Sequence, residues 1–92
     1  MRVPVEIPEA LWGKSRWRGR IIDIHVDKGQ RVKVGDPLIE VEIDKAVVVV
    51  ESPYEGVIVD VLVAPGDEIG PGDVVVVMEV GSRDTVEAAG PA

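Results

Sequence analysis

The sequence contains no cysteine, no phenylalanine and a single histidine, His25, among its 92 residues. Without cysteine the chain has no disulfide framework, no thiol nucleophile and no thiolate metal ligand. Any histidine-based metal centre or hydrolytic triad would have to depend on His25 alone. We therefore predict neither a catalytic site nor a metal site.

Long apolar runs and net positive charge are also missing. The longest apolar runs, Ala46 to Val50 and Val74 to Met78, fall far short of the roughly 20 residues that a membrane-spanning helix needs. Residues Met1 to Glu6 lack the apolar core of a signal peptide. A net charge of -7 repels phosphate backbones. We expect a soluble cytoplasmic chain, or a piece of one, with neither a nucleic-acid partner nor a membrane.

Valine and isoleucine are abundant, and hydrophobic residues make up 46% of the chain. These β-branched residues favour strands. Ile22, Ile24 and Val26 alternate with other side chains at a period of two, whereas no segment shows a convincing helical period. Pro65-Gly66 and similar dipeptides mark turns between the runs. The pattern predicts an all-β domain of about eight short strands.

An internal repeat organises these strands. The segment Gly19 to Ile43 aligns without a gap with Gly56 to Val80, at an offset of 37 residues. The identical pairs are Gly19/Gly56, Ile21/Ile58, Asp23/Asp60, Val26/Val63, Gly29/Gly66, Gly35/Gly72, Asp36/Asp73 and Glu42/Glu79. Two copies are too few for a solenoid. We therefore predict a flattened barrel or sandwich of two antiparallel four-stranded sheets, related by a pseudo-two-fold axis.

One lysine breaks the equivalence of the two copies. Lys45 lies between the strand-like runs Glu40 to Ile43 and Ala46 to Val50, so Asp44 and Lys45 must form a tight hairpin turn. The corresponding position in the second copy is Ser82, just past the last predicted strand. The repeat thus places the hairpin tip at one end of the domain and the chain ends at the other. This arrangement suits a tethered carrier that presents a modified amine.

The sequence around this lysine resembles a lipoyl domain. The segment Glu42-Ile43-Asp44-Lys45-Ala46, preceded by Lys28-Gly-Gln-Arg-Val-Lys-Val-Gly-Asp-Pro-Leu-Ile-Glu-Val41, is similar to the attachment hairpin of that family. Lipoyl domains usually carry Thr or Ser where this chain has Ile43. The related biotinyl domains typically carry Met-Lys-Met. The resemblance covers Met1 to Gly81, and residues 82–92 resemble the start of a flexible interdomain linker.

The resemblance implies a function for Lys45 and its neighbours. Lipoic acid would be joined to Lys45 by an amide, and Asp44 and Ala46 would help the attaching enzyme, a lipoate ligase or lipoyl transferase, recognise the turn. The domain would be a monomeric, non-catalytic carrier that shuttles acyl groups and reducing equivalents. Its partners would be a 2-oxo acid decarboxylase subunit and dihydrolipoamide dehydrogenase, and its parent protein a dihydrolipoyl acyltransferase. The fold implied is the hammerhead, or single hybrid motif.

The sequence is compatible with two alternative functions and contains one further candidate site. The same fold serves as the biotin carrier of carboxylases, and as an unmodified structural adaptor. Leu11 and Trp12 lie in the extra loop Ile7 to Gly13, which has no counterpart in the second copy. In lipoyl domains this loop lies near the attachment hairpin and helps partner recognition. The alternative interpretation is that Trp12 caps the edge of the core.

Overall fold

The computed structural model describes residues 1–13 and 18–81 and contains two four-stranded antiparallel sheets, which confirms the predicted fold class. The predicted linker at 82–92 lies outside the described residues. The elements in chain order are β1 (Arg2–Glu6), α1 (Glu9–Trp12), β2 (Gly19–Ile24), β3 (Arg31–Val32), β4 (Pro37–Ile43), β5 (Ala46–Glu51), β6 (Gly56–Val61), β7 (Glu68–Ile69) and β8 (Val74–Val80).

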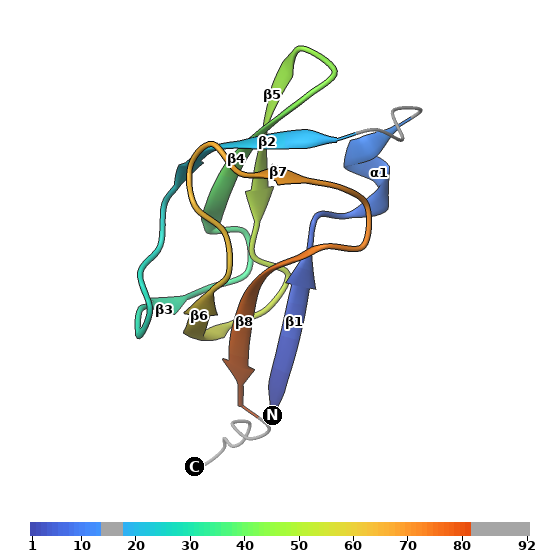
Figure 1. Ribbon diagram of the computed structural model, residues 1–92. Helices are drawn as coiled ribbons and strands as arrows, with labels where there is room; N and C mark the ends of the chain where they lie inside the picture. The colour runs from blue at the N-terminus through green and yellow to red at the C-terminus, as the bar shows by residue number, and fades with distance from the viewer. Residues whose placement is uncertain (14–17, 82–92) are drawn as a thin grey trace.

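The repeat maps one sheet onto the other. One sheet has the order β1-β8-β6-β3 and the other β5-β4-β2-β7, so β2, β3 and β4 correspond to β6, β7 and β8. The two remaining strands are also equivalent, because β1 pairs with β8 in one sheet and β5 pairs with β4 in the other. The β4–β5 hairpin consequently lies at the opposite end of the molecule from the N-terminus and the end of β8 (Figure 1). This confirms the arrangement that the repeat predicts.

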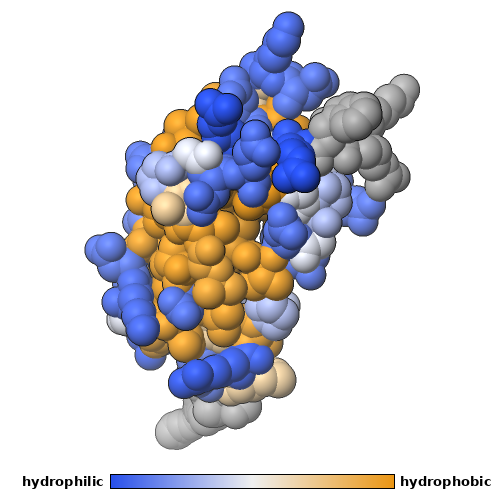
Figure 2. Space-filling view, viewed as in Figure 1, coloured by the Kyte–Doolittle hydropathy of each residue, from blue (hydrophilic) through white to orange (hydrophobic). Residues whose placement is uncertain are grey.

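The hydrophobic core is built from equivalent side chains of the two copies. At six pairs of equivalent positions, the side chains of both copies are buried. The equivalent pairs are Ile21/Ile58, Val32/Ile69, Leu38/Val75, Ile39/Val76, Val41/Met78 and Val50/Val5. Burial of so many aliphatic side chains is the main driving force for joining the two halves. On the face seen in Figure 2, hydrophobic residues gather in the middle and hydrophilic residues lie toward both ends. Neither half could bury its apolar face alone.

Aspartates shared by the two copies fix the strand irregularities and turns. β2 and β6 each contain a register shift, between Ile21 and Asp23 and between Ile58 and Asp60. At each shift the aspartate Oδ1 accepts a hydrogen bond from the next residue's N–H, at 2.9 Å for Asp23 and 3.0 Å for Asp60. In the turns before β4 and β8, Asp36 and Asp73 each accept a hydrogen bond through Oδ2 from the N–H three residues earlier, at 2.8 Å. The repeated Gly-Asp dipeptides therefore encode backbone geometry.

Two equivalent glycines allow a close approach between strands at the start of β2 and β6. A Cβ atom on Gly56 would lie 2.3 Å from the carbonyl oxygen of Glu79. A Cβ atom on Gly19 would meet the Cγ1 atom of Val41 at 2.9 Å and the carbonyl oxygen of Glu42 at 3.1 Å. The first contact is with rigid backbone, while the nearest atom in the second belongs to a side chain.

The first residue of the chain completes the sheet at the end opposite the hairpin. The backbone N–H of Val80 donates to the carbonyl oxygen of Met1 at 2.7 Å, and the Met1 ammonium donates to Glu79 Oε2 at 2.5 Å. This hydrogen bond, with a contribution from Arg2, lowers the pKa of Glu79 below its usual value. The ionised form is therefore favoured by folding, and its contribution to stability is lost as the pH falls through the acid range.

The segment from Ile7 to Gly13 differs from the loop predicted there. It contains one turn of α-helix, α1, in which the N–H of Leu11 donates to the carbonyl oxygen of Pro8 at 2.9 Å. Four residues are too few to show a helical period in the sequence, which is why the pattern predicted a loop. No helix in the described residues is long and apolar enough to cross a membrane.

We expect Gly56→Ala to destabilise the domain more than the pseudosymmetric change Gly19→Ala. The added methyl must displace backbone at Gly56, with an expected loss of about 3 kcal/mol, whereas Val41 can shift at Gly19, with an expected loss of about 1 kcal/mol. Urea unfolding followed by far-ultraviolet circular dichroism measures both changes. Equal losses for the two variants would show that the strand approach at Gly56 is not the tighter one.

Candidate functional site

Lys45 lies in a two-residue turn that joins β4 to β5. Ile43 pairs with Ala46 across the hairpin, so Asp44 and Lys45 alone make the turn. Both have positive φ, 52° for Asp44 and 69° for Lys45. Two central residues with positive φ define a type I′ turn, whose twist matches that of the flanking strands. The structure therefore confirms the predicted tight turn and places Asp44, Lys45 and Ala46 at the surface.

The left-handed conformation of Lys45 is unusual for a residue with a long side chain. Type I′ turns favour asparagine and glycine because a Cβ atom clashes with the backbone when φ is positive. Apart from glycines, Asp44 and Lys45 are the only residues with positive φ in the described part of the chain. The strain is thus confined to the tip of the hairpin, as is common at functional positions.

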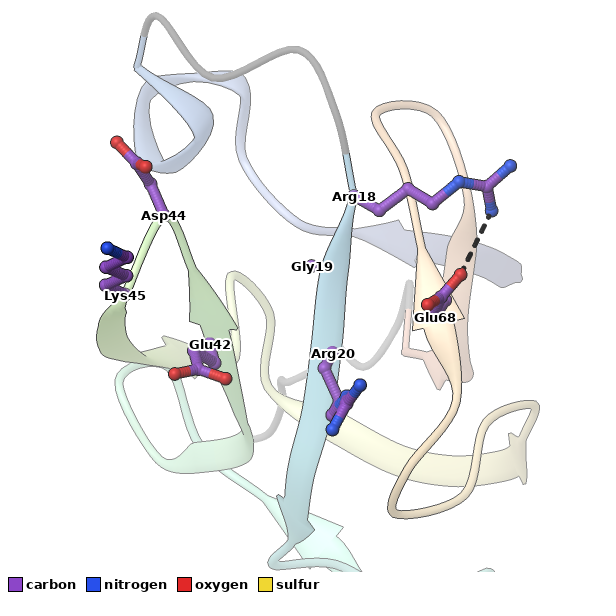
Figure 3. A pocket seen from close by; sticks show the side chains of 7 residues that line it. All are labelled: Arg18, Gly19, Arg20, Glu42, Asp44, Lys45 and Glu68. Carbon is purple, nitrogen blue, oxygen red and sulfur yellow. Dashed lines mark ion pairs between the residues drawn. The ribbon is translucent and has the colours of Figure 1, made fainter.

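An open hollow of about 300 Å³ lies beside this turn. Its lining combines the hairpin with the start of β2 and with β7, and comprises Arg18, Gly19, Arg20, Glu42, Asp44, Lys45 and Glu68 (Figure 3). Arg20 lies opposite Glu42 on β4 and opposite Glu68 on β7, so its cation stands between two carboxylates on the outer face of the sheet. A guanidinium nitrogen of Arg18 lies 3.7 Å from Glu68 Oε1.

Lys45, like Arg20 and unlike Arg18, forms no salt bridge among the described residues. Within the described residues, no carboxylate lies close enough to its ammonium group to form a salt bridge, although Asp44 precedes it in the turn. Its side chain is exposed and extends from the hairpin away from the core (Figure 3). An acyl group could therefore be joined to this amine without moving any buried side chain.

The two residues predicted for partner recognition lie on α1, and they differ in exposure. Trp12 is only 4% exposed and belongs to the core, while Leu11 is partly buried against it. The Nε1 atom of Trp12 is buried and has no hydrogen-bond partner among the described residues. Packing therefore accounts for Trp12 in this structure. A role for either residue in binding a partner stays a prediction.

Two features of the lysine-bearing sheet were not predicted from the sequence. His25 Nε2 lies 3.2 Å from Glu40 Oε2 on the lysine-bearing sheet, at a position that alternation alone marks as an ordinary strand residue. The cluster of Arg18, Arg20 and Glu68 arises because β7 pairs with the start of β2. These residues are far apart in the sequence, so only the strand order brings them together.

A duplicated sandwich that presents a lysine on a tight hairpin is the carrier architecture of cofactor-attachment domains. The model of the biotin/lipoyl family, described as "Biotin-requiring enzyme", matches residues 5–78. The chain belongs to this family, and membership implies a covalently attached lipoyl or biotin group. In the chain described here, that match extends from β1 into β8.

Known proteins similar to this chain include a curated relative and two solved structures. The dihydrolipoyllysine-residue acetyltransferase component of the acetoin cleaving system of Cupriavidus necator is 37% identical over 54 residues. The match covers 59% of this chain and 14% of that protein. The chain thus spans only a small part of the length of this curated relative.

Two solved structures share the fold. A single-chain, multi-domain long-chain acyl-CoA carboxylase superposes with a TM-score of 0.70 and 23% identity, covering 89% of this chain and 7% of the carboxylase. The lipoyl domain of the 2-oxoglutarate dehydrogenase complex from Azotobacter vinelandii superposes with a TM-score of 0.61 and 24% identity. That match covers 87% of this chain and 98% of the lipoyl domain. At this identity the two structures establish the fold and do not distinguish the cofactor.

We expect Lys45→Gly to stabilise the domain, although the change removes the amine. Glycine adopts positive φ without a steric cost, so the expected gain is about 0.5–1 kcal/mol. The neighbouring change Ala46→Gly is the control, because it falls on a strand residue and should cost about 0.5–1 kcal/mol. Thermal unfolding of both variants measures the difference. A Lys45→Gly variant less stable than the wild type would contradict the inferred strain.

We expect Trp12→Phe to leave stability nearly unchanged and Trp12→Ala to cost about 3–5 kcal/mol. Phenylalanine keeps most of the buried ring and removes the unpaired Nε1 group, so the polar penalty disappears as the smaller ring loses contacts. Chemical denaturation compares the three proteins. A small effect of Trp12→Ala would argue that the side chain serves a purpose other than packing.

Proposed function

We propose that this chain is a lipoyl carrier domain whose Lys45 is amidated by lipoic acid. The observation that carries the proposal is the sequence Asp44-Lys45-Ala46 on an exposed type I′ turn, in a chain of the biotin/lipoyl family. The domain itself has no catalytic role. Its parent would be a dihydrolipoyl acyltransferase, in which the modified lysine acts as a swinging arm.

Lipoate is favoured over biotin by the residues that flank the lysine. Asp44 and Ala46 correspond to the Asp-Lys-Ala pattern of lipoyl domains, and neither position carries the methionine typical of biotinyl domains. The Cupriavidus necator relative is a dihydrolipoyllysine-residue acetyltransferase component, which supports the same choice. A biotin carrier remains the second candidate because the carboxylase shares the fold over 89% of this chain.

The protein's own contribution is to position the amine and to shape its surroundings. The type I′ turn holds Lys45 beyond both strands, so an attaching enzyme can reach the amine while the sheets stay intact. When bound, the lipoyl group supplies a disulfide that accepts an acyl group together with an electron pair and then yields the acyl group to coenzyme A. Tethering keeps the local concentration of this group high.

Attachment also changes the charge of the hollow beside the turn. Before modification the lining contains the cations Arg18, Arg20 and Lys45, and the carboxylates of Glu42, Asp44 and Glu68. Amide formation removes the charge of Lys45 and leaves the carboxylates in excess. Enzymes that act on the modified domain would therefore meet a more acidic tip than the attaching enzyme does, and electrostatic complementarity could select the correct form.

The partners of the proposed function follow from the chemistry of the arm. A lipoate ligase or lipoyl transferase would form the amide at Lys45. A 2-oxo acid decarboxylase subunit would load the arm, and dihydrolipoamide dehydrogenase would reoxidise it after acyl transfer. The identity of the 2-oxo acid belongs to the decarboxylase and is not encoded in the hairpin.

We expect coexpression with a lipoate ligase to add one lipoyl group to the wild-type chain and none to Lys45→Arg. Arginine keeps the positive charge and fits the same turn, but its guanidinium is a far poorer nucleophile than a lysine amine. Lys33→Arg, at another exposed lysine, is the matched control and should be labelled like the wild type. Intact mass spectrometry counts the groups added.

A parallel coexpression with a biotin ligase separates the two candidate cofactors. Lipoyl addition without biotin addition is the expected result. Biotin addition to Lys45 without lipoyl addition would contradict the proposal and show that the chain is a biotin carrier. Labelling that persists in Lys45→Arg would move the attachment site to another lysine.

A further inference from the structure

The four edge strands of the two sheets are protected to different degrees. A free edge offers unpaired backbone groups to other chains, and proteins usually shorten such strands or place charges and proline on them. β3 and β7 are only two residues long. β1 carries Arg2, Pro4 and Glu6. β5, in contrast, runs for six residues from Ala46 and has no charge or proline before Glu51.

The pairing of β5 with β4 determines which of its backbone groups are free. In an antiparallel pair, residues alternate between those that bond to the neighbouring strand and those that point away. Ala46 and Ile43 close the two-residue turn as a bonded pair, so Val48 and Val50 also bond to β4. Val47 and Val49 therefore direct their N–H and C=O groups outward. Among the described residues no strand lies beside them on that side.

The same two residues expose their side chains. Val47 is 58% exposed and Val49 is 45% exposed, on the outer face of the sheet. The pseudosymmetric strand β1 shows what a protected edge looks like in this fold. Arg2 lies opposite Glu79 as Val47 lies opposite Glu42, and Pro4 occupies the position that corresponds to Val49. Proline there removes an outward N–H group, and arginine supplies a charge.

We propose that the β5 edge is a docking site for β5 of a second copy of this chain. The two strands would run antiparallel about a two-fold axis and join the two lysine-bearing sheets into one. Such an interface is isologous, because the same surface is used by both copies. The inference rests on the backbone and valines of the β5 edge, and a cofactor on Lys45 would remove only the charge contribution of that amine.

The alternation of free backbone groups restricts the register. An outward-pointing residue must face another outward-pointing residue, so Val47 can lie opposite Val49 of the second copy with Val48 on the axis. This register gives each Val47 and Val49 a reciprocal pair of hydrogen bonds and covers their exposed side chains. It also brings Lys45, in the turn just before β5, toward Glu51 at the far end of β5 of the second copy, at both ends of the interface. Opposite charges that lie across an interface are stabilising, so the edge is complementary to itself.

The association should be weak. Contact along one short strand buries less than the roughly 1,200 Å² at which interfaces of standard size begin. The isolated domain is accordingly a monomer when dilute, and pairs form as the concentration approaches about 1 mM, which a short flexible tether gives to linked modules.

Sedimentation velocity of the 92-residue chain from about 10 μM to about 1 mM tests the proposal. The weight-average sedimentation coefficient of the wild type should rise toward that of a dimer. The double change Val47→Arg with Val49→Pro copies the β1 pattern onto β5 and should keep the protein monomeric throughout. Because Pro4 already occupies the equivalent position, this variant is expected to fold, and circular dichroism verifies it.

Further variants test the proposal independently of the double change Val47→Arg with Val49→Pro. Glu51→Lys should weaken the association about fivefold by placing like charges across the interface, and adding Lys45→Glu should restore it. Arg2→Val with Pro4→Val gives β1 the exposed valines of β5 and should produce species larger than dimers.

A wild type that stays monomeric at about 1 mM would overturn the proposal, even if a strand of another protein were found on β5. A dimer that survives Val47→Arg with Val49→Pro would overturn it as well, because the interface would then lie elsewhere. Hydrogen exchange gives an independent readout. Slower exchange of the Val47 and Val49 amides at high concentration is the result expected, and unchanged exchange would contradict the assigned register.

Discussion

The register of the two-residue turn between Ile43 and Ala46 is the constraint on which the lysine-bearing half of the molecule depends. Because side chains alternate along a strand, that single pairing sends Val48 and Val50 inward and Val47 and Val49 outward. A slip by one residue would bury the wrong set and move Lys45 onto a strand face. The position of the amine and the composition of the core therefore follow from the same geometric choice.

The two copies of the repeat have kept their backbone requirements and changed their surfaces. Glycine at Gly19 and Gly56 permits a close strand approach in both copies, and aspartate at Asp23 and Asp60 makes the same hydrogen bond at the same register shift. The outer edges differ, with valines on β5 and Arg2 and Pro4 on β1. Shared geometry thus supports one end that presents an amine and an opposite end where β1 begins and β8 finishes.

Much of the fold could be predicted because these requirements recur at a fixed spacing in the sequence. The repeat indicated two equivalent sheets, and the absence of intervening residues indicated the tight turn at Asp44 and Lys45. The helix α1 escaped prediction because one turn leaves no periodic signal. The register shifts escaped prediction as well, because an aspartate at Asp23 or Asp60 does not by itself specify a bulge.

The surroundings of the lysine were harder to predict than its position. Arg18 and Glu68 meet because β2 pairs with β7, and strand order of this kind is decided by packing of the whole sandwich. The burial of Trp12 depends on how α1 folds back over the core, which short-range sequence patterns do not record. The conformation of a turn depends on neighbouring residues and can be predicted from them. The charged hollow is formed by elements from three parts of the chain, so it cannot be predicted in this way.

The pairing of β1 with β8 has a consequence for how the molecule folds. The first and last strands of the described chain lie side by side, so this contact closes a loop that contains every other element. The β4–β5 hairpin, by comparison, needs only adjacent residues. Contacts of long sequence separation carry a greater loop-closure entropy and slow folding. During synthesis the lysine-bearing hairpin can form early, while β1 must wait, unpaired, until β8 has emerged.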